Sequence, residues 1–241
     1  MKIKYLFSFL IWCSLFACKS SGNKQKSDTA DAGAISSSLK LLGSYVGAFG
    51  DNKITLLITR ASGDTIEGRS IVGGNDRPFS GRLKNDGDHY SIIAKEPGDD
   101  KYDGVFNLNI NSKQPDIVTG TWEPNTAGAH LGPKSFSLQR RSFVYLQDVG
   151  EFPEASKRLL KEEDVNNLMK PELELMRNSI FARHGYCFRK KDLRETFEDK
   201  DWYIPNTVDV RKDLTETEKK NIVLIKKYEK YAEEYGDDFG R

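Results

Sequence analysis

The octapeptide FARHGYCF at positions 181–188 gathers three side chains that can do chemistry, Arg183, His184 and Cys187. A cysteine becomes a catalytic nucleophile when a histidine within hydrogen-bond reach takes its proton and a third group orients that histidine. Such a pair would make the chain a hydrolase that acts through Cys187 and His184. The segment holds no second histidine, however, and Cys187 lies between two aromatic residues, where a thiol packs as a small hydrophobic side chain. We therefore expect no catalysis, no cofactor and no metal site.

The same octapeptide is typical of the end of a helix. Four residues before its glycine recur at spacings of three and four: Leu173, Met176, Ile180 and His184. They predict an amphipathic helix with Pro171 in its first turn. Gly185 is suited to the left-handed conformation after the last turn, and Tyr186 can pack back on Phe181, which is the hydrophobic contact of a Schellman cap. Each residue of the octapeptide thus also has a structural explanation.

Two further helices are predicted after the octapeptide. Asp192 followed by Glu195 suggests a capping box for a short helix, and Thr215 followed by Glu218 suggests another. The second of these helices is long, and apolar residues at helical spacing mark one face of it. These residues are Ile222, Ile225, Tyr228 and Ala232.

Several motifs in this half of the chain occur in a fixed order. They are ELELMRNSIFARHGYCF at 172–188, the pair Trp202 and Tyr203, and LTETEKKNIVLIKKYE at 214–229. The series resembles the YARHG domain of bacterial exported proteins over residues 161–230, with Asn178, Phe181 and Gly185 in the motif itself. Phe181 replaces the tyrosine of the family name, so the hydroxyl group is absent here. The resemblance implies a mostly helical, extracytoplasmic module that acts at the cell envelope, and it supplies no catalytic residues.

A binding role for this module gives its polar and aromatic residues a use. Tyr186, Trp202 and Tyr203 can stack on sugars, and the cationic side chains can address carboxylates. The candidate binding residues are Arg177, Arg183, His184, Tyr186, Arg189, Trp202 and Tyr203. The alternative is that the aromatic residues form the core and the arginines pair with nearby carboxylates. For each single residue the alternative is favoured, whereas for the chain as a whole we expect binding of peptidoglycan or an envelope protein.

Residues 42–143 have the pattern of short strands. Gly104, Phe106, Leu108 and Ile110 alternate with polar residues, and Tyr102 continues the same face. Similar runs separated by turn residues predict roughly eight antiparallel strands that close into a small barrel or a rolled sandwich, because closure removes exposed edges.

The first and last predicted strands are similar to those of lipocalin and avidin barrels, in having Gly43 and Tyr45 at the start and Arg140 and Arg141 at the end. This likeness implies an interior that can carry one small apolar ligand. The alternative is an interior filled by side chains, and protein packing density favours it. The side chains expected to fill it include Phe49, Ile54, Phe106 and Trp122.

The first residues, MKIKYLFSFLIWCSLFAC, predict export. Lysines precede an apolar run that is too short to span a bilayer, which needs about 20 apolar residues. The run ends in LFAC, which resembles the lipobox of bacterial lipoproteins and implies lipidation of Cys18 and anchoring to the envelope, on the outer membrane facing the periplasm. An ordinary secretory signal cut near Ala17 is the alternative. Cys13 leaves with the signal peptide and Cys18 would carry the lipid, so Cys187 is the only thiol that remains, and no internal disulfide is expected.

The chain is therefore predicted to be α+β with two domains. The expected segments are a signal peptide (1–17), a flexible, polar tether (18–38), the antiparallel barrel domain (39–145), a linker (146–155), the helical domain (156–235) and a tail (236–241). The formal net charge of +1 gives no general attraction to nucleic acid, so the membrane and an envelope partner are the expected contacts. The sequence indicates no oligomeric state.

Overall fold

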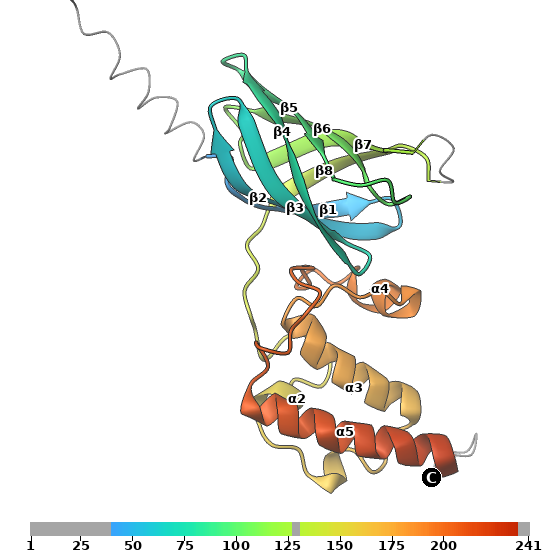
Figure 1. Ribbon diagram of the computed structural model, residues 1–241. Coiled ribbons are helices and arrows are strands. Elements are labelled where there is room, and N and C mark those ends of the chain that lie inside the picture. The colour runs from blue at the N-terminus through green and yellow to red at the C-terminus, as the bar shows by residue number, and fades with distance from the viewer. Residues whose placement is uncertain (1–39, 127–130, 236–241) are drawn as a thin grey trace, which may run out of the picture.

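The computed structural model describes residues 40–126 and 131–235, which form a β-barrel and a helical domain that lie next to each other (Figure 1). The predicted signal peptide, the tether, Cys18 and the C-terminal tail lie outside the described residues. No helix within the described ranges is long and apolar enough to cross a membrane.

The first body is a closed barrel of eight antiparallel strands in simple sequential order. The strands are β1 (Gly43–Phe49), β2 (Asn52–Ser62), β3 (Thr65–Val72), β4 (Asn75–Asn85), β5 (His89–Lys95), β6 (Gly104–Asn111), β7 (Ile117–Pro124) and β8 (Lys134–Arg140). Each strand pairs with the next, and β8 pairs with β1. The prediction of an antiparallel barrel is confirmed. Because the strands alternate in direction, the turns β1–β2, β3–β4, β5–β6 and β7–β8 lie at one end of the barrel, which we call the mouth.

Barrel closure depends on the residues that suggested the lipocalin-like ends. Tyr45 in β1 lies opposite Arg140 in β8, and the Arg140 guanidinium lies 4.7 Å from the centre of the tyrosine ring. Arg140 Nη2 also donates a hydrogen bond to the Tyr45 hydroxyl at 2.5 Å. Burial raises the pKa of Tyr45 to about 12, although the neighbouring Arg140 acts in the opposite direction. The first and last strands are therefore joined by side chains as well as by backbone.

Aromatic side chains fill the interior of the barrel. Phe49, Ile54, Phe106 and Trp122, which were expected to do so, all belong to one buried core cluster. The rings of Phe49 and Trp122 lie 5.8 Å apart in an edge-to-face arrangement. The expectation for Tyr102 was wrong: it precedes the first residue of β6 and is 44% exposed.

The second body is helical. Its elements are α2 (Glu154–Lys157), the 3₁₀ turn η1 (Glu162–Asp164), α3 (Lys170–Arg183), α4 (Lys191–Phe197) and α5 (Glu216–Tyr235). Helix α3 packs against α5 over a shared apolar core that includes Leu173, Met176 and Ile225. Figure 1 shows these two helices below the barrel, with α4 nearer to it.

One predicted capping box is present and the other is not. Thr215 N–H donates to Glu218 Oε2 at 2.9 Å, and Glu218 N–H donates to Thr215 Oγ1 at 3.2 Å, so the prediction for α5 is confirmed. The prediction for α4 was wrong, because the N-cap residue is Lys190 and no side chain caps it. Asp192 lies inside the first turn, where a carboxylate still favours the positive end of the helix.

Candidate functional site

The octapeptide ends α3 by the predicted cap. Tyr186 N–H donates to the Phe181 carbonyl at 3.1 Å and Gly185 N–H donates to the Ala182 carbonyl at 2.9 Å, which is the bond pair of a Schellman motif. Gly185 has φ of 70°, in the left-handed region. The rings of Phe181 and Tyr186 lie 6.2 Å apart and complete the hydrophobic contact. The prediction of a glycine-capped helix end is confirmed.

The Arg183 side chain is buried and donates hydrogen bonds within the fold. Its side chain is 1% exposed. The guanidinium donates to the Val149 carbonyl at 2.9 Å, to Ser156 Oγ at 3.2 Å and to the Glu151 carbonyl. These bonds hold the segment predicted as a linker against the end of α3. The structure therefore does not place Arg183 where a partner can reach it.

His184 and Glu218 form a buried pair between α3 and α5. His184 Nε2 lies 2.8 Å from Glu218 Oε2, and the Tyr145 hydroxyl donates to Glu218 Oε1 at 2.9 Å. The rings of Tyr145 and His184 are stacked with centres 4.2 Å apart. Burial alone would raise the pKa of Glu218, but hydrogen bonds from His184 and the Thr215 backbone lower it to about 2. The histidine is thus part of a polar network that joins the segment after β8 to both helices.

Asn221 completes this set of buried motif residues. Its amide group donates to the Ala155 carbonyl at 2.8 Å and to the Arg158 carbonyl at 2.7 Å, and its Oδ1 accepts from Leu160 N–H at 2.9 Å. An asparagine with three bonds to α2 and the residues just after it fixes the path of this segment. The motif residues of α5 therefore position the chain that precedes α3.

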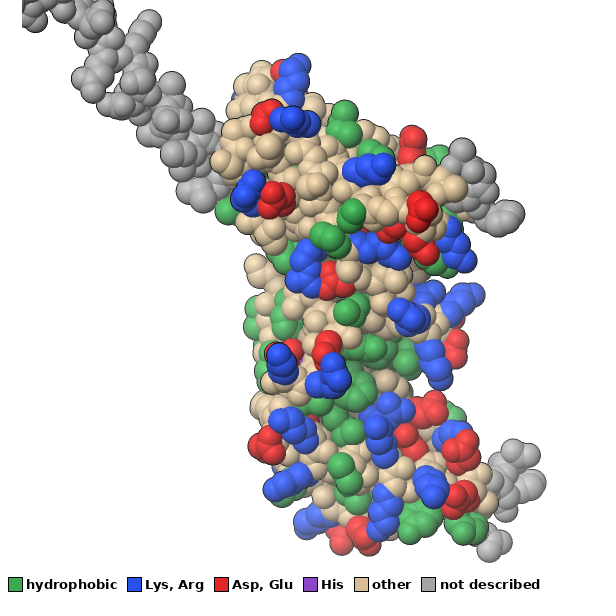
Figure 2. Space-filling model, viewed as in Figure 1, with side chains coloured by type: hydrophobic (Ala, Val, Ile, Leu, Met, Phe, Trp, Pro, Cys, Tyr) green, Lys and Arg blue, Asp and Glu red, His purple; other side chains and the backbone are tan. Residues whose placement is uncertain are grey.

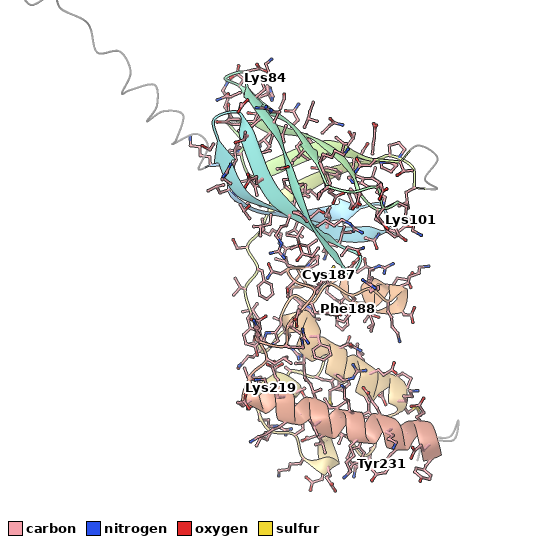
Figure 3. All side chains as sticks on the ribbon, in the orientation of Figure 1. Lys84, Lys101, Cys187, Phe188, Lys219 and Tyr231 are labelled. Atoms are coloured by element: carbon pink, nitrogen blue, oxygen red, sulfur yellow. The ribbon has the colours of Figure 1, made fainter. Side chains whose placement is uncertain are left out.

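Cys187 lies at the junction of the two bodies (Figure 3). The thiol is 1% exposed, and its Sγ accepts a hydrogen bond from Gly74 N–H in the β3–β4 turn at 3.1 Å. Burial raises its pKa to about 12. Within the described part of the chain, no hydrogen bond joins Cys187 to His184. The geometry does not assemble the cysteine and histidine pair that the sequence raised as a possibility.

Trp202 and Tyr203 belong to the aromatic core of the helical domain. Tyr203 has no exposed surface, and its hydroxyl donates to the Tyr186 carbonyl at 2.7 Å. Trp202 packs edge-on against Phe197 with ring centres 6.2 Å apart, and it lies close to Gly150. Tyr203 is therefore not where a sugar can stack, and Trp202 is only partly buried but does not line the pocket between α3, α4 and α5.

The remaining candidates line an open pocket of 630 Å³, which we call the helical groove. It lies between α3, α4, α5 and the loop 208–214. Arg177, Tyr186 and Arg189 line it, together with the motif residues Asn178 and Phe181. Its apolar wall also contains Phe188, Leu193, Val210, Leu214 and Ile222. Figure 2 shows hydrophobic side chains exposed between lysine and arginine side chains on the visible face of this domain. The groove combines apolar surface with positive charge.

Part of that positive charge has no partner among the described residues. Arg177 Nε pairs with Glu229 at 2.7 Å, and Arg211 pairs with Asp209, which is the one carboxylate in the lining. Arg189, Lys190 and Lys226 line the groove and form no salt bridge with a described carboxylate. A groove with unpaired cations beside aromatic rings is suited to a ligand that carries carboxylates and apolar groups.

The junction between the two bodies could not be expected from the sequence. Lys53 N–H donates to Glu198 Oε2 at 2.8 Å, and Lys53 Nζ donates to the Lys200 carbonyl at 2.9 Å. Burial raises the pKa of Glu198, and the hydrogen bond from Lys53 opposes this effect. Lys53 and Glu198 lie 145 positions apart, and neither belongs to a motif.

Comparison with known proteins finds a match in the helical domain. Residues 151–230 match the family model of the YARHG domain. The match begins before residue 161, and it therefore includes Glu151, Ser156 and Leu160, which bind Arg183 and Asn221. No curated protein and no solved structure matches the chain. The described residues contain no group of three histidine, cysteine or acidic side chains that could hold a metal ion.

Proposed function

We propose that the chain is an exported, lipid-anchored envelope protein whose YARHG domain binds a carboxylate-bearing partner through the helical groove. One observation carries the proposal. The polar motif residues Arg183 and His184 are buried and bonded within the fold. Arg189, Lys190 and Lys226, in contrast, line the apolar groove and have no salt-bridge partner among the described residues. Unpaired cations that converge on a concave surface attract anionic ligands.

Peptidoglycan is the partner that this chemistry favours. Its peptide stems end in carboxylates and its glycan chains offer apolar sugar faces, which match the two kinds of surface in the groove. Tyr186 is partly exposed at the groove and can stack on a sugar, and the guanidinium of Arg189 can bind a carboxylate in two-point fashion. An envelope protein with an exposed acidic segment is the other partner with such chemistry.

The anchor explains how the groove would be presented. Several acyl chains on Cys18 would give stable attachment, because each buried methylene contributes about 0.8 kcal/mol. The polar residues 18–38 would then act as a tether on the periplasmic side of the outer membrane. Replacing Cys18 by alanine should release the protein from the membrane fraction, and continued membrane attachment would contradict the anchor.

Two other functions receive less support from the geometry. A hydrolase acting through Cys187 would need a reactive thiolate, and burial raises the pKa of this thiol to about 12. A carrier of an apolar ligand inside the barrel would need space that Phe49, Phe106 and Trp122 occupy. We therefore propose a binding protein and not an enzyme.

The binding proposal is tested by sedimentation with insoluble peptidoglycan. The soluble form, residues 39–241, contains both cores and should be retained. The double variant Lys190→Ala/Lys226→Ala should lose affinity by about tenfold, since one or two charge-assisted hydrogen bonds are removed. The matched control is Lys219→Ala/Lys230→Ala, which removes two lysines of the same domain outside the groove. Equal retention of both double variants would contradict a role for the groove. If the wild type captures a protein from envelope extract and only Lys190→Ala/Lys226→Ala fails to do so, the result would favour an envelope protein as the partner.

A further inference from the structure

A second pocket, of 530 Å³, lies at the mouth of the barrel, and we call it the mouth pocket. Residues of the β1–β2, β3–β4, β5–β6 and β7–β8 turns and strand ends line it, and the helical domain adds Arg189 and Arg194. Figure 3 places Lys101, at the β5–β6 turn, on the side of the barrel near α4. The pocket is therefore built from both bodies and not from the barrel alone. Its volume is in the range of small-molecule sites.

The floor of the mouth pocket is aromatic. Phe49, Phe106 and Trp122 line it, and they are members of the packed barrel core that face the mouth. The ring of Phe49 lies 6.3 Å from that of Phe106 and 5.8 Å from that of Trp122. A flat apolar group is the shape that packs on such a surface.

The acidic groups of the mouth pocket are already engaged. Glu96 is 2% exposed, and its Oε2 accepts hydrogen bonds from Gly104 N–H at 2.9 Å and from Trp122 Nε1 at 3.1 Å. Its Oε1 accepts a hydrogen bond from Ser70. Asp100, the other acidic residue of the lining, lies 3.7 Å from Arg77, and Arg77 Nε also pairs with Asp103 at 2.8 Å. Glu96 is thus held by neutral hydrogen-bond donors and Asp100 lies beside Arg77, and neither carboxylate forms a salt bridge with another cation of the lining among the described residues.

Three cations of the lining lack such partners. Lys134, Arg189 and Arg194 form no salt bridge with any carboxylate of residues 40–126 and 131–235. Lys134 Nζ lies 4.6 Å from the centre of the Phe49 ring, directly above the aromatic floor. Burial lowers the pKa of Lys134, and Asp51, which lies outside the pocket lining, opposes this effect. Positive charge thus lies at the entrance of an apolar floor without a salt-bridge partner among the described residues.

We infer that the mouth pocket binds a small organic anion, in which a carboxylate or sulfonate is attached to a flat apolar body. The flat body packs on Phe49 and Trp122, and the anionic group faces Lys134 and Arg194. Because Lys134 belongs to the barrel and Arg194 belongs to the helical domain, one ligand contacts both bodies. This site differs from the helical groove and shares only Arg189 with it. A failure of one binding proposal would therefore not contradict the other.

A matched pair of probes tests the inference. The anionic probe is 8-anilinonaphthalene-1-sulfonate, and the neutral control is N-phenyl-1-naphthylamine, which lacks the sulfonate. Titration calorimetry on residues 39–241 should give one site for the anion, with an affinity at least about tenfold higher than that of the neutral analogue. Equal affinities, or no binding of the anion, would overturn the inference.

Side-chain variants locate the site. Lys134→Gln and Arg194→Gln should each weaken binding of the anion by about tenfold, because each removes a charge-assisted contact. Lys84→Gln, at the far end of the barrel (Figure 3), should leave the affinity unchanged. Unchanged affinity in both pocket variants would overturn the inference.

Discussion

The backbone N–H of Gly74 donates a hydrogen bond to the Sγ of Cys187 at 3.1 Å, across 113 positions of sequence. Gly74 lies in the turn between β3 and β4, and Cys187 follows the glycine cap of α3. The thiol that the sequence raised as a possible nucleophile thus contributes a hydrogen bond to the junction between the barrel and the YARHG domain. Gly74 has φ of 78°, and a Cβ there would lie 2.6 Å from Arg189 Cβ. Only a glycine allows the turn to approach so closely.

The buried thiol should react slowly. Because burial raises the pKa of Cys187 to about 12, the thiolate that reacts with disulfide reagents is scarce at pH 8. We expect labelling by a chromogenic disulfide reagent to be roughly a thousandfold slower than that of an exposed cysteine, with normal labelling after unfolding in urea. Labelling that is complete within the mixing time of the native protein would contradict the buried position.

Gly74→Ala should open the junction. The added Cβ collides with Arg189, so the turn must move away from the helical domain, and we expect labelling of Cys187 to accelerate by at least about tenfold. Gly73→Ala is a matched control, since Gly73 also has positive φ, of 58°, but nothing lies within 4 Å of the added Cβ. Both variants strain the turn, and only Gly74→Ala touches the other body. Equal labelling rates in the two variants would show that the turn does not protect the thiol.

Gly185→Ala should destabilise the protein more than the same substitution at a left-handed glycine that has open space around it. The φ of 70° costs about 1 kcal/mol for alanine, and the new Cβ would lie 2.8 Å from both Asn206 Cβ and Phe143 Cε2. We expect a total loss of about 2 kcal/mol or more in the free energy of unfolding by urea. Gly63→Ala, with φ of 58° and open space, should lose only the conformational part. Similar losses in the two variants would mean that packing around Gly185 adjusts freely.

The features that the sequence predicted are encoded in contiguous residues. The strands follow from alternation, the end of α3 follows from Gly185 and Tyr186, and the start of α5 follows from Thr215 and Glu218. These signals need no knowledge of the rest of the chain. They were sufficient for the two-domain α+β fold and for the YARHG resemblance.

The roles of the site residues depend on distant partners and were not predictable in the same way. Arg183 and His184 are buried because Val149 and Glu218, each 34 positions away, bind them. Arg177 and Arg189 have the same residue type and remain at the groove. The mouth pocket combines Lys134 with cations of another domain, and no spacing rule connects such residues. Residue type therefore indicated which side chains can bind a carboxylate, and tertiary contacts decided which of them are available.

The last prediction concerns acid stability. Hydrogen bonds lower the pKa of Glu218 to about 2, against 4.5 for an ordinary glutamate, so the unfolded chain binds this proton more readily than the folded chain. The carboxylate therefore contributes stability above about pH 4.5, and this contribution is lost as the pH falls toward 2. Glu218→Gln should lower the free energy of unfolding at pH 7 by about 3 kcal/mol. The amide oxygen of glutamine can still accept from Thr215 N–H, so the variant removes mainly the charge.

Urea unfolding followed from pH 7 to pH 2 checks this expectation. The difference between wild type and Glu218→Gln should be constant down to about pH 4.5 and should shrink toward zero near pH 2. Glu216→Gln is the control, because this neighbouring carboxylate is exposed and pairs with Lys219 at 2.8 Å on the same helix turn. Its effect should be small at every pH. A pH-independent difference for Glu218→Gln would mean that the glutamate acts through its shape and not through its charge, and the buried contact with His184 would then not be a charge-stabilised pair.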